Sequence, residues 1–237
     1  MTAELVVVKG KDRGAFVALA KDLRAAWPAA ILTAPAGWVT LNTPAVDPTW
    51  PELAKVVDQI NLMSYGMAGP WGGWQSWHSS ALIGESASMP SSVDVSVKNY
   101  LKAGVPAAKL GVGIGFYGSC WRGVSAVRMP ITGASLVADD GKMSFANIMT
   151  SYYQAAAYHY DAAAKAPWLG FSTQTGPEKC NLVTYEDATS LADKGKYVRD
   201  TGLGGAIIWT INQGHLASAP AGSRDPLLAA VKKAFLD

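Results

Sequence analysis

Aromatic side chains gather in one glycine-rich stretch of this chain. Trp71, Trp74 and Trp77 lie in the segment 66–90, which is rich in Gly, Trp and Ser. A loop of this length inside a compact domain is usually functional or disordered, and the tryptophans favour a function. Because an indole ring offers a flat apolar surface and one polar group, we interpret these tryptophans as the wall of a ligand site.

The sequence disfavours both a dinucleotide site and a serine-hydrolase site. Gly113, Gly115 and Gly118 match G-x-G-x-x-G after a strand pattern, but no helix pattern follows them, so a dinucleotide site is not expected. The chain contains no G-x-S-x-G elbow, which disfavours a serine hydrolase without excluding a triad built in another way.

Histidine and cysteine are also candidates for chemistry. His78, His159 and His215 lie far apart without paired ligand spacing, so we expect surface or hydrogen-bonded histidines and neither a metal site nor a cofactor. Cys120 and Cys180 could form a disulfide that closes a loop of about 60 residues and suits an exported protein. Two free buried thiols are the alternative.

Composition excludes several classes of partner. The chain has 237 residues, 49% of them hydrophobic, and a formal net charge of only +2. Its 20 basic residues are scattered, so no nucleic-acid surface is expected. No apolar run approaches the roughly 20 residues of a membrane span. The apolar block 5–8 is too short for a signal-peptide core, so any export signal was removed or never existed, and localisation cannot be assigned from this chain.

Apolar strand patterns alternate with helical patterns along most of the chain. This alternation is typical of βαβ units and predicts an α/β fold with a buried parallel sheet. The predicted strands are 31–34, 59–65, 109–115 and 205–210, with 5–8 as a short additional candidate.

Helix caps predict where the intervening helices begin and end. The first helix is predicted to begin at a capping Asp12 and to turn Phe16, Leu19 and Leu23 inward as one apolar stripe. The others are predicted from Thr49 (N-cap) to 57, from Ser91 or Ser92 to Gly104, from Asp187 to Gly202, and from Pro226 to Phe235 with Asp225 as cap. Residues 119–184 leave this rhythm and are predicted to form a small α+β insertion, with a helix over 144–165.

Four segments together resemble glycoside hydrolase family 18, the chitinases and chitinase-like proteins. QINLMSYGMAGPW at 59–71 resembles the sixth barrel strand of that family, and KLGVGIGFYG at 109–118 resembles the seventh. YHYDAAAKAPWL at 158–169 resembles the family's α+β insertion, and the run from Val183 to His215 resembles the approach to the eighth strand.

The resemblance implies a fold and a ligand. It implies a single domain over 1–237 that is a partial (β/α)8 TIM barrel, roughly strands five to eight, with 119–184 as the insertion after the seventh strand. Met63, Tyr65 and Trp209 match family residues around the sugar at the cleavage point, and Trp71 matches the Trp after the sixth strand. For Trp209, a core Trp at a strand end is the alternative. The ligand is then a chitin-type oligosaccharide, and family resemblance implies secretion.

The chain also departs from the family pattern. The family's general acid comes from a D-x-x-D-x-D-x-E run, which this sequence lacks, and Gly66 stands where the family has Asp after the Tyr. The chain therefore looks truncated, and its catalytic residues are unknown beyond the family-matched Tyr65. A positioned general acid is worth about 10² to 10⁴ in rate, so its loss should nearly abolish hydrolysis unless Glu85, Asp139 or Glu186 replaces it.

Three functions remain open from the sequence. The chain is a chitinase-type glycosidase acting on β-1,4-linked N-acetylglucosamine oligomers, a non-catalytic chitin-binding protein, or a hydrolase of another class such as an esterase. Half a barrel would leave its inner face uncovered, with Ile31, Leu62, Ile114 and Ile207 expected on that face. A homodimer that completes the half-barrel is therefore expected, and a monomer covered by its insertion or its long loop is the alternative.

Overall fold

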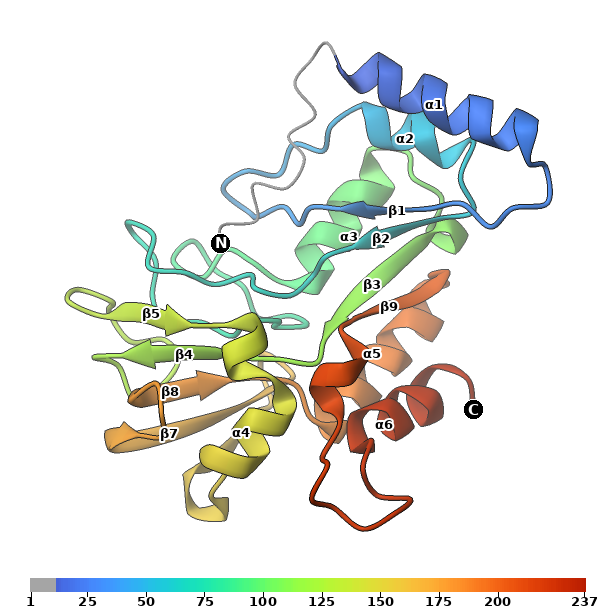
Figure 1. Ribbon diagram of the computed structural model, residues 1–237. Helices are drawn as coiled ribbons and strands as arrows, with labels where there is room; N and C mark the ends of the chain where they lie inside the picture. The colour runs from blue at the N-terminus through green and yellow to red at the C-terminus, as the bar shows by residue number, and fades with distance from the viewer. Residues whose placement is uncertain (1–11) are drawn as a thin grey trace.

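A parallel sheet lies at the centre of the structure, a computed structural model that describes residues 12–237 (Figure 1). The predicted strand segment 5–8 lies outside the described residues. Within the described part of the chain, the strands follow the order β1-β2-β3-β9, all parallel. The fold class is therefore α/β, as predicted. The strands are β1 (Thr33–Ala36), β2 (Gln59–Leu62), β3 (Leu110–Gly115) and β9 (Gly205–Trp209).

One face of this sheet packs against helices and the other is more open. Leu62 and Ile114 are fully buried in the core, and Ile208, opposite Ile114 in the register, packs against the same core. Successive side chains of a strand point to opposite faces, so Ile207 lies on the open face. Leu62 and Ile114 were expected on that open face, and this expectation was wrong. Ile31 lies just before β1 and is 84% exposed.

Local capping chemistry explains several helix boundaries. Helix α3 (Val93–Lys102) begins after Ser92, whose side chain accepts a hydrogen bond from the Val95 backbone N–H. Helix α5 (Ala188–Thr201) begins with a capping box between Asp187 and Ser190 and ends at Gly202 in the left-handed conformation. These boundaries agree closely with the predictions from sequence.

Other predicted caps and faces differ in the structure. Helix α1 (Asp12–Ala26) leaves Leu19 and Leu23 exposed, because the core it contacts is reached mainly by Ala20 and partly by Phe16. The predicted inward stripe is therefore wrong for both leucines. Helix α2 (Thr49–Ala54) is shorter than predicted and has Pro48 rather than Thr49 at its N-cap.

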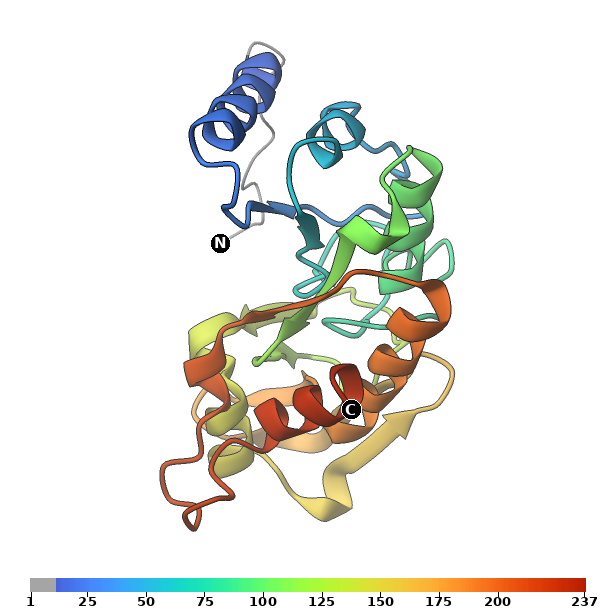
Figure 2. The same ribbon diagram turned by 90° about the vertical axis from the view of Figure 1, so that its right-hand side faces the viewer.

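The last helix, α6 (Pro226–Phe235), packs on α5. Figures 1 and 2 show α5 and α6 beside β9, at the end of the sheet away from α1 and α2. Asp225 occupies the N-cap position of α6, but it makes no side-chain cap bond. Its carboxylate instead lies 2.8 Å from Nδ1 of His215.

Residues 119–184 form a second, antiparallel sheet in the order β5-β4-β8-β7-β6. The predicted helix 144–165 is largely wrong. Ser144 does cap a helix, but α4 (Phe145–Ser151) ends early, and 158–161 pairs instead as strand β6 with β7. The strands are β4 (Ser119–Arg122), β5 (Ser135–Ala138), β6 (Tyr158–Asp161), β7 (Ala166–Thr175) and β8 (Cys180–Thr184). Short 3-10 helices are η1 (Ala107–Lys109), η2 (Asp140–Met143), η3 (Ala155–Ala157) and η4 (Ile211–Gly214).

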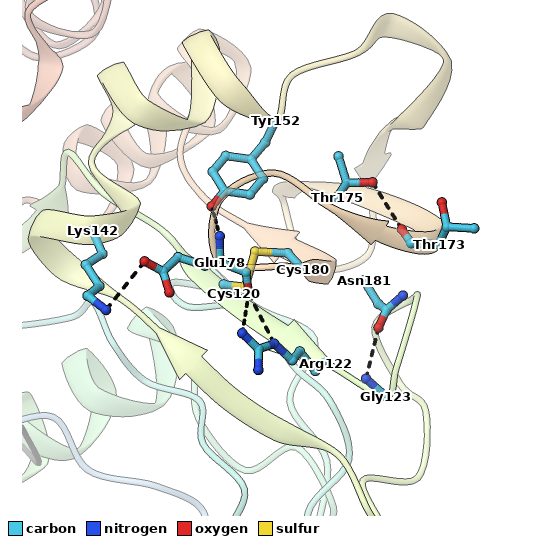
Figure 3. Close-up of a disulfide and its surroundings, with 10 residues drawn as sticks. All are labelled: Cys120, Arg122, Gly123, Lys142, Tyr152, Thr173, Thr175, Glu178, Cys180 and Asn181. Atoms are coloured by element: carbon cyan, nitrogen blue, oxygen red, sulfur yellow. Dashed lines mark hydrogen bonds and ion pairs between the residues drawn. A yellow bond between two sulfur atoms is a disulfide. The ribbon is translucent and has the colours of Figure 1, made fainter.

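A disulfide joins Cys120 of β4 to Cys180 of β8 (Figure 3). Both cysteines are fully buried, and their Cα atoms are 5.3 Å apart. The guanidinium of Arg122 donates two hydrogen bonds to the Glu178 carbonyl beside this bridge. In the chain-entropy account, a crosslink that closes a loop of about 60 residues contributes about 4 kcal/mol. Of the two alternatives for these cysteines, the disulfide is the one in the structure.

Candidate functional site

Aromatic residues lie at the carboxyl ends of three neighbouring parallel strands. Tyr65 follows β2 and Tyr117 follows β3, while Trp209 is the last residue of β9. The tyrosine rings meet edge to face, with centroids 5.8 Å apart. Trp209 pairs in the register with Gly115, and a Cβ atom on Gly115 would lie 3.1 Å from the Tyr65 Cβ. These three aromatic residues therefore form one row across the strand ends, which we call the central aromatic row.

The exposure of this row differs along its length. Trp209 is 48% exposed, whereas Tyr117 is almost fully buried and Tyr65 is half-buried. Burial, with a smaller effect from the nearby Asp140 carboxylate, raises the pKa of Tyr65 to about 12. The Tyr65 phenol therefore remains protonated at neutral pH and can donate a hydrogen bond. Gln213 donates to Asp140 at 2.7 Å and holds that carboxylate near the row.

Glycine at position 66 matches the local backbone. Gly66 has φ +62°, and a Cβ atom there would lie 3.3 Å from the Tyr117 hydroxyl oxygen. A side chain at this position would be strained in conformation and would crowd Tyr117. The local geometry beside Tyr65 therefore favours Gly at position 66, where the family that the sequence resembles has Asp.

A second aromatic group lies in the loops that leave β1 and β2. The ring centroids of Trp38 and Trp71 are 6.0 Å apart, and those of Trp71 and Trp74 are 4.7 Å apart. Trp71 is 39% exposed and packs directly over Gly69, where a Cβ atom would lie 2.8 Å from the indole. We call Trp38, Trp71 and Trp74 the tryptophan cluster. Met63, between β2 and Tyr65, is half-buried.

Trp77 does not belong to a ligand-facing wall. It is fully buried, and its indole N–H donates to the Ser91 carbonyl at 2.8 Å. The expectation that Trp71, Trp74 and Trp77 share one wall was therefore wrong for Trp77. In the sequence, the glycine-rich segment around Trp77 looks like an exposed loop. In the structure, this loop folds back and covers the Trp77 indole.

The carboxylates considered as replacement acids lie in different places. Asp139 and Asp140 lie close enough to Tyr117 to raise its pKa further, although burial is the main cause. Glu186 is buried and forms an ion pair with Lys194, far from solvent. Glu85 lies near enough to Lys98 of α3 and Tyr197 of α5 to raise the pKa of each slightly.

The histidines are held in structural contacts. His78 is almost fully buried, with Nε2 2.9 Å from the Asp161 carboxylate, and burial lowers its pKa. His159 stacks on Trp168 with centroids 4.1 Å apart. Between residues 12 and 237, no group of three or more His, Cys, Asp or Glu is arranged to hold a metal ion. The same residues include no helix long and apolar enough to cross a membrane.

Sequence reasoning missed part of this site. Tyr117 and Trp38 each lie two residues beyond the end of a parallel strand, as Tyr65 lies three residues beyond β2. Ligand sites of barrels lie at the carboxyl ends of the strands, so this shared position was an available signal. Asp140 had no such signal, because it enters the site from the antiparallel part of the chain.

Comparison with known proteins gives a consistent match. The family model described as "Glycosyl hydrolases family 18" matches residues 5–214. Chitinase A1 from Niallia circulans is 30% identical over 176 residues, which cover 68% of this chain and 24% of that protein. The chain thus spans about a quarter of the length of this curated relative.

Solved structures match over nearly the whole chain. The Group IV chitinase of Ostrinia furnacalis superimposes with a TM-score of 0.73 and 25% sequence identity, covering 96% of this chain and 64% of that one. A second structure of that chitinase, in complex with allosamidin, gives a TM-score of 0.72 and 26% identity, with 94% and 62% covered.

Proposed function

The chain belongs to glycosyl hydrolase family 18, and from this premise we propose that its central aromatic row binds β-1,4-linked N-acetylglucosamine oligomers. One observation carries the proposal, the meeting of Tyr65, Tyr117 and Trp209 at the carboxyl ends of adjacent strands. The half-exposed Trp209 indole offers a platform for a sugar ring. The protonated Tyr65 phenol offers a donor to the acetamide carbonyl.

The tryptophan cluster extends the proposed site. Trp71 and Trp38 lie beyond the ends of β2 and β1, so an oligomer that begins on Trp209 and passes Tyr65 continues toward them. Neighbouring strands lie about 4.8 Å apart, so the row from β9 to β1 spans about 15 Å, enough for several sugar units. Met63 and Tyr65 lie under the middle of this path.

Turnover by this chain alone is not part of the proposal. The 237-residue sequence contains no D-x-x-D-x-D-x-E run. Glu186 is engaged with Lys194, and Glu85 acts electrostatically on Lys98 and Tyr197, whereas Asp139 acts on Tyr117 of the aromatic row, so we take Asp139 as the candidate acid nearest to the row. We infer that the chain binds chitin-type oligosaccharides with little or no hydrolysis, and that its strands correspond to roughly the fifth to eighth strands of the family barrel, with 119–184 as an insertion.

The partner and the compartment are proposed on separate grounds. Strand β1 lies at the edge of the parallel sheet in the described residues, and Ile31 beside it is exposed. Because open faces and bare edges of parallel sheets are normally covered, we propose that two copies associate there.

The Cys120–Cys180 disulfide is typical of oxidising compartments and supports export from the cytosol.

Titration calorimetry with the N-acetylglucosamine hexamer tests the binding proposal. We expect saturable binding of the hexamer, and no binding of a β-1,4-linked glucose hexamer that lacks acetamides. A chromogenic N-acetylglucosamine oligomer and a short-chain nitrophenyl ester, assayed in parallel, separate binding from glycosidase and esterase activity. Absence of hexamer binding at millimolar concentration contradicts the proposal. Turnover in the ordinary enzymatic range, about 1 to 10³ per second, contradicts the inference of little hydrolysis.

A further inference from the structure

A buried charge pair is connected by hydrogen bonds to the residue that precedes Tyr65. Lys194 of α5 is fully buried and Glu186, just before α5, is 2% exposed. Their ammonium and carboxylate groups are in contact. The other Glu186 oxygen accepts a hydrogen bond from the Ser190 hydroxyl at 2.6 Å. Removing two charges from water costs free energy. The proposed sugar site uses neither group directly, so the function of this buried pair needs a separate explanation.

The ammonium of Lys194 reaches the long loop 66–90. Its Nζ lies 2.6 Å from the Ser80 hydroxyl oxygen and 3.0 Å from the Ser80 carbonyl oxygen. An ammonium group can only donate, so the Ser80 hydroxyl accepts from Lys194. Its own proton then points to the Ser64 carbonyl oxygen, 2.5 Å away. The charge on Lys194 thereby sets the direction of this short hydrogen-bond chain.

Ser79, the residue before Ser80, holds the residue on the other side of Tyr65. The Ser79 hydroxyl accepts from the backbone N–H of Gly66 at 3.2 Å. The Ser79 N–H in turn donates to the Thr184 hydroxyl of β8 at 3.1 Å. Ser79 and Ser80 thus hold the peptide groups on both sides of Tyr65, and we call this pair the serine clamp.

Ser64 itself is tied to the neighbouring strand. Its hydroxyl donates to the Gly113 carbonyl at 3.1 Å and lies 2.8 Å from the Gly113 N–H. A Cβ atom on Gly113 would lie 2.8 Å from the Tyr65 ring, so the ring rests directly on this strand. With its ring on β3 and both adjacent peptides bonded, Tyr65 has little freedom to turn.

We propose that Ser80 is a positioning residue, which, oriented by the Lys194 ammonium, fixes the backbone beside Tyr65 and so directs the Tyr65 hydroxyl into the aromatic site. The inference rests on the proposed sugar site for its purpose, but the clamp itself is a property of the free protein. Glu186 pairs with Lys194 and holds the Lys194 ammonium group in place.

Fluorine NMR of the full chain with 3-fluorotyrosine at position 65 tests the clamp without a ligand. We expect one sharp resonance for the unaltered chain, and a shifted or broadened resonance for Ser80→Ala. Ser80→Thr keeps the hydroxyl and should restore the original signal. Ser76→Ala is the matched control, because Ser76 is an equally buried serine that bonds the backbone of Ala126 and Met129 instead. It should leave the signal unchanged.

Calorimetry with the N-acetylglucosamine hexamer adds the functional measurement. Ordering a freed side chain on binding costs enough to lower affinity about 2- to 10-fold, so Ser80→Ala should bind that much more weakly than Ser76→Ala. If Ser80→Ala fails to fold, Thr184→Val, which releases Ser79, should shift the same resonance.

The outcomes separate the two proposals. A Tyr65 signal that is unchanged in a folded Ser80→Ala chain overturns the positioning role, and so does an equal shift in Ser76→Ala. If the unaltered chain binds no hexamer while Ser80→Ala still shifts the Tyr65 signal, the sugar site is overturned and the clamp stands.

Discussion

Trp209 is the most exposed member of the central aromatic row. We predict that Trp209→Ala weakens binding of the N-acetylglucosamine hexamer by about 1–3 kcal/mol, by analogy with the loss of a stacked aromatic platform. Calorimetry measures the change directly. Trp27→Ala is the control, because Trp27 is 70% exposed but lies between α1 and the amino end of β1, whereas the aromatic row lies at the carboxyl ends of the strands. Equal affinity in the Trp209 variant and the unaltered chain would falsify the platform role.

The raised pKa of Tyr65 makes the stability of the protein depend on pH in the alkaline range. Its folded pKa is raised to about 12, while an unfolded tyrosine titrates near about 10. Below pH 10 both states hold the proton, and above it the unfolded state loses the proton first. The stability tied to Tyr65 is therefore fully present below about pH 10 and declines as pH rises toward 12.

Urea unfolding at a series of pH values checks this effect. We predict that Tyr65→Phe, which has no phenol to ionise, loses less stability than the unaltered chain between about pH 10 and 12. Other buried tyrosines, such as Tyr100, also have raised pKa values, so only the difference between the two proteins isolates Tyr65. Parallel curves for both proteins would contradict the prediction.

At the scale of elements, Asp161 ties the long loop 66–90 to strand β6. Its carboxylate accepts from His78 of that loop and pairs with Arg128, whose guanidinium lies 4.9 Å from the Trp77 ring centre. Burial opposes ionisation of Asp161, but the hydrogen bonds from His78 and Arg128 outweigh it and hold its pKa well below the usual range. The loop that carries Trp71 and Trp74 therefore depends on a charge from the antiparallel sheet.

We predict that Asp161→Asn lowers the free energy of unfolding by about 1–3 kcal/mol at pH 7, because His78 and the partly exposed Arg128 lose their charged acceptor. Asp200→Asn is the control. It breaks an exposed pair with Lys196 one turn away on α5, which should cost no more than about 0.5 kcal/mol. Urea unfolding monitored by Trp fluorescence measures both.

The same pair of variants has a defined pH dependence. Because the folded pKa of Asp161 is lowered, its contribution is present above the unfolded value of about 3.9 and is lost as pH falls through the folded value. The difference between the unaltered chain and Asp161→Asn should therefore shrink below about pH 4. A difference that stays constant into strong acid would show that the charge of Asp161 is not its cause.

For the whole molecule, the open face of the parallel sheet decides the expected assembly. Of the four apolar side chains first assigned to that face, Leu62 and Ile114 lie in the core instead, while Ile31 is exposed and Ile207 partly so. We predict a homodimer, because the edge at β1 and the open face both lack cover in the described residues. Multi-angle light scattering should give twice 24.9 kDa.

Replacing Ile31 provides the variant for this measurement. Ile31→Lys should shift the mass toward that of one chain, since a charge beside β1 blocks edge pairing. Leu236→Lys, on an equally exposed leucine at the far end of the chain, should not. A well-folded species of 24.9 kDa for the unaltered chain ends the dimer proposal.

The amino-acid sequence by itself determined the features that depend on local chemistry. The caps at Ser92 and Asp187 and the glycine stop at Gly202 are contacts within a few residues, so they could be predicted. The buried run of β3 and the family motif around Tyr65 are likewise contained in short stretches. These features were sufficient for the α/β class and for part of the aromatic row.

Contacts between distant segments were decided only by the tertiary structure. Segment 158–161 lies in an alanine-rich stretch that favours a helix, but it pairs with β7, because its two tyrosines suit a strand and its backbone hydrogen bonds go to that neighbour. Trp77 is buried because its loop folds over it, and Ile114 faces the helices because alternation places it opposite the glycines of β3. Asp140 reaches Tyr65 from about 75 residues away, and Lys194 reaches Ser80 across 114 residues. No local pattern encodes such distances, since only the folded chain brings these groups together.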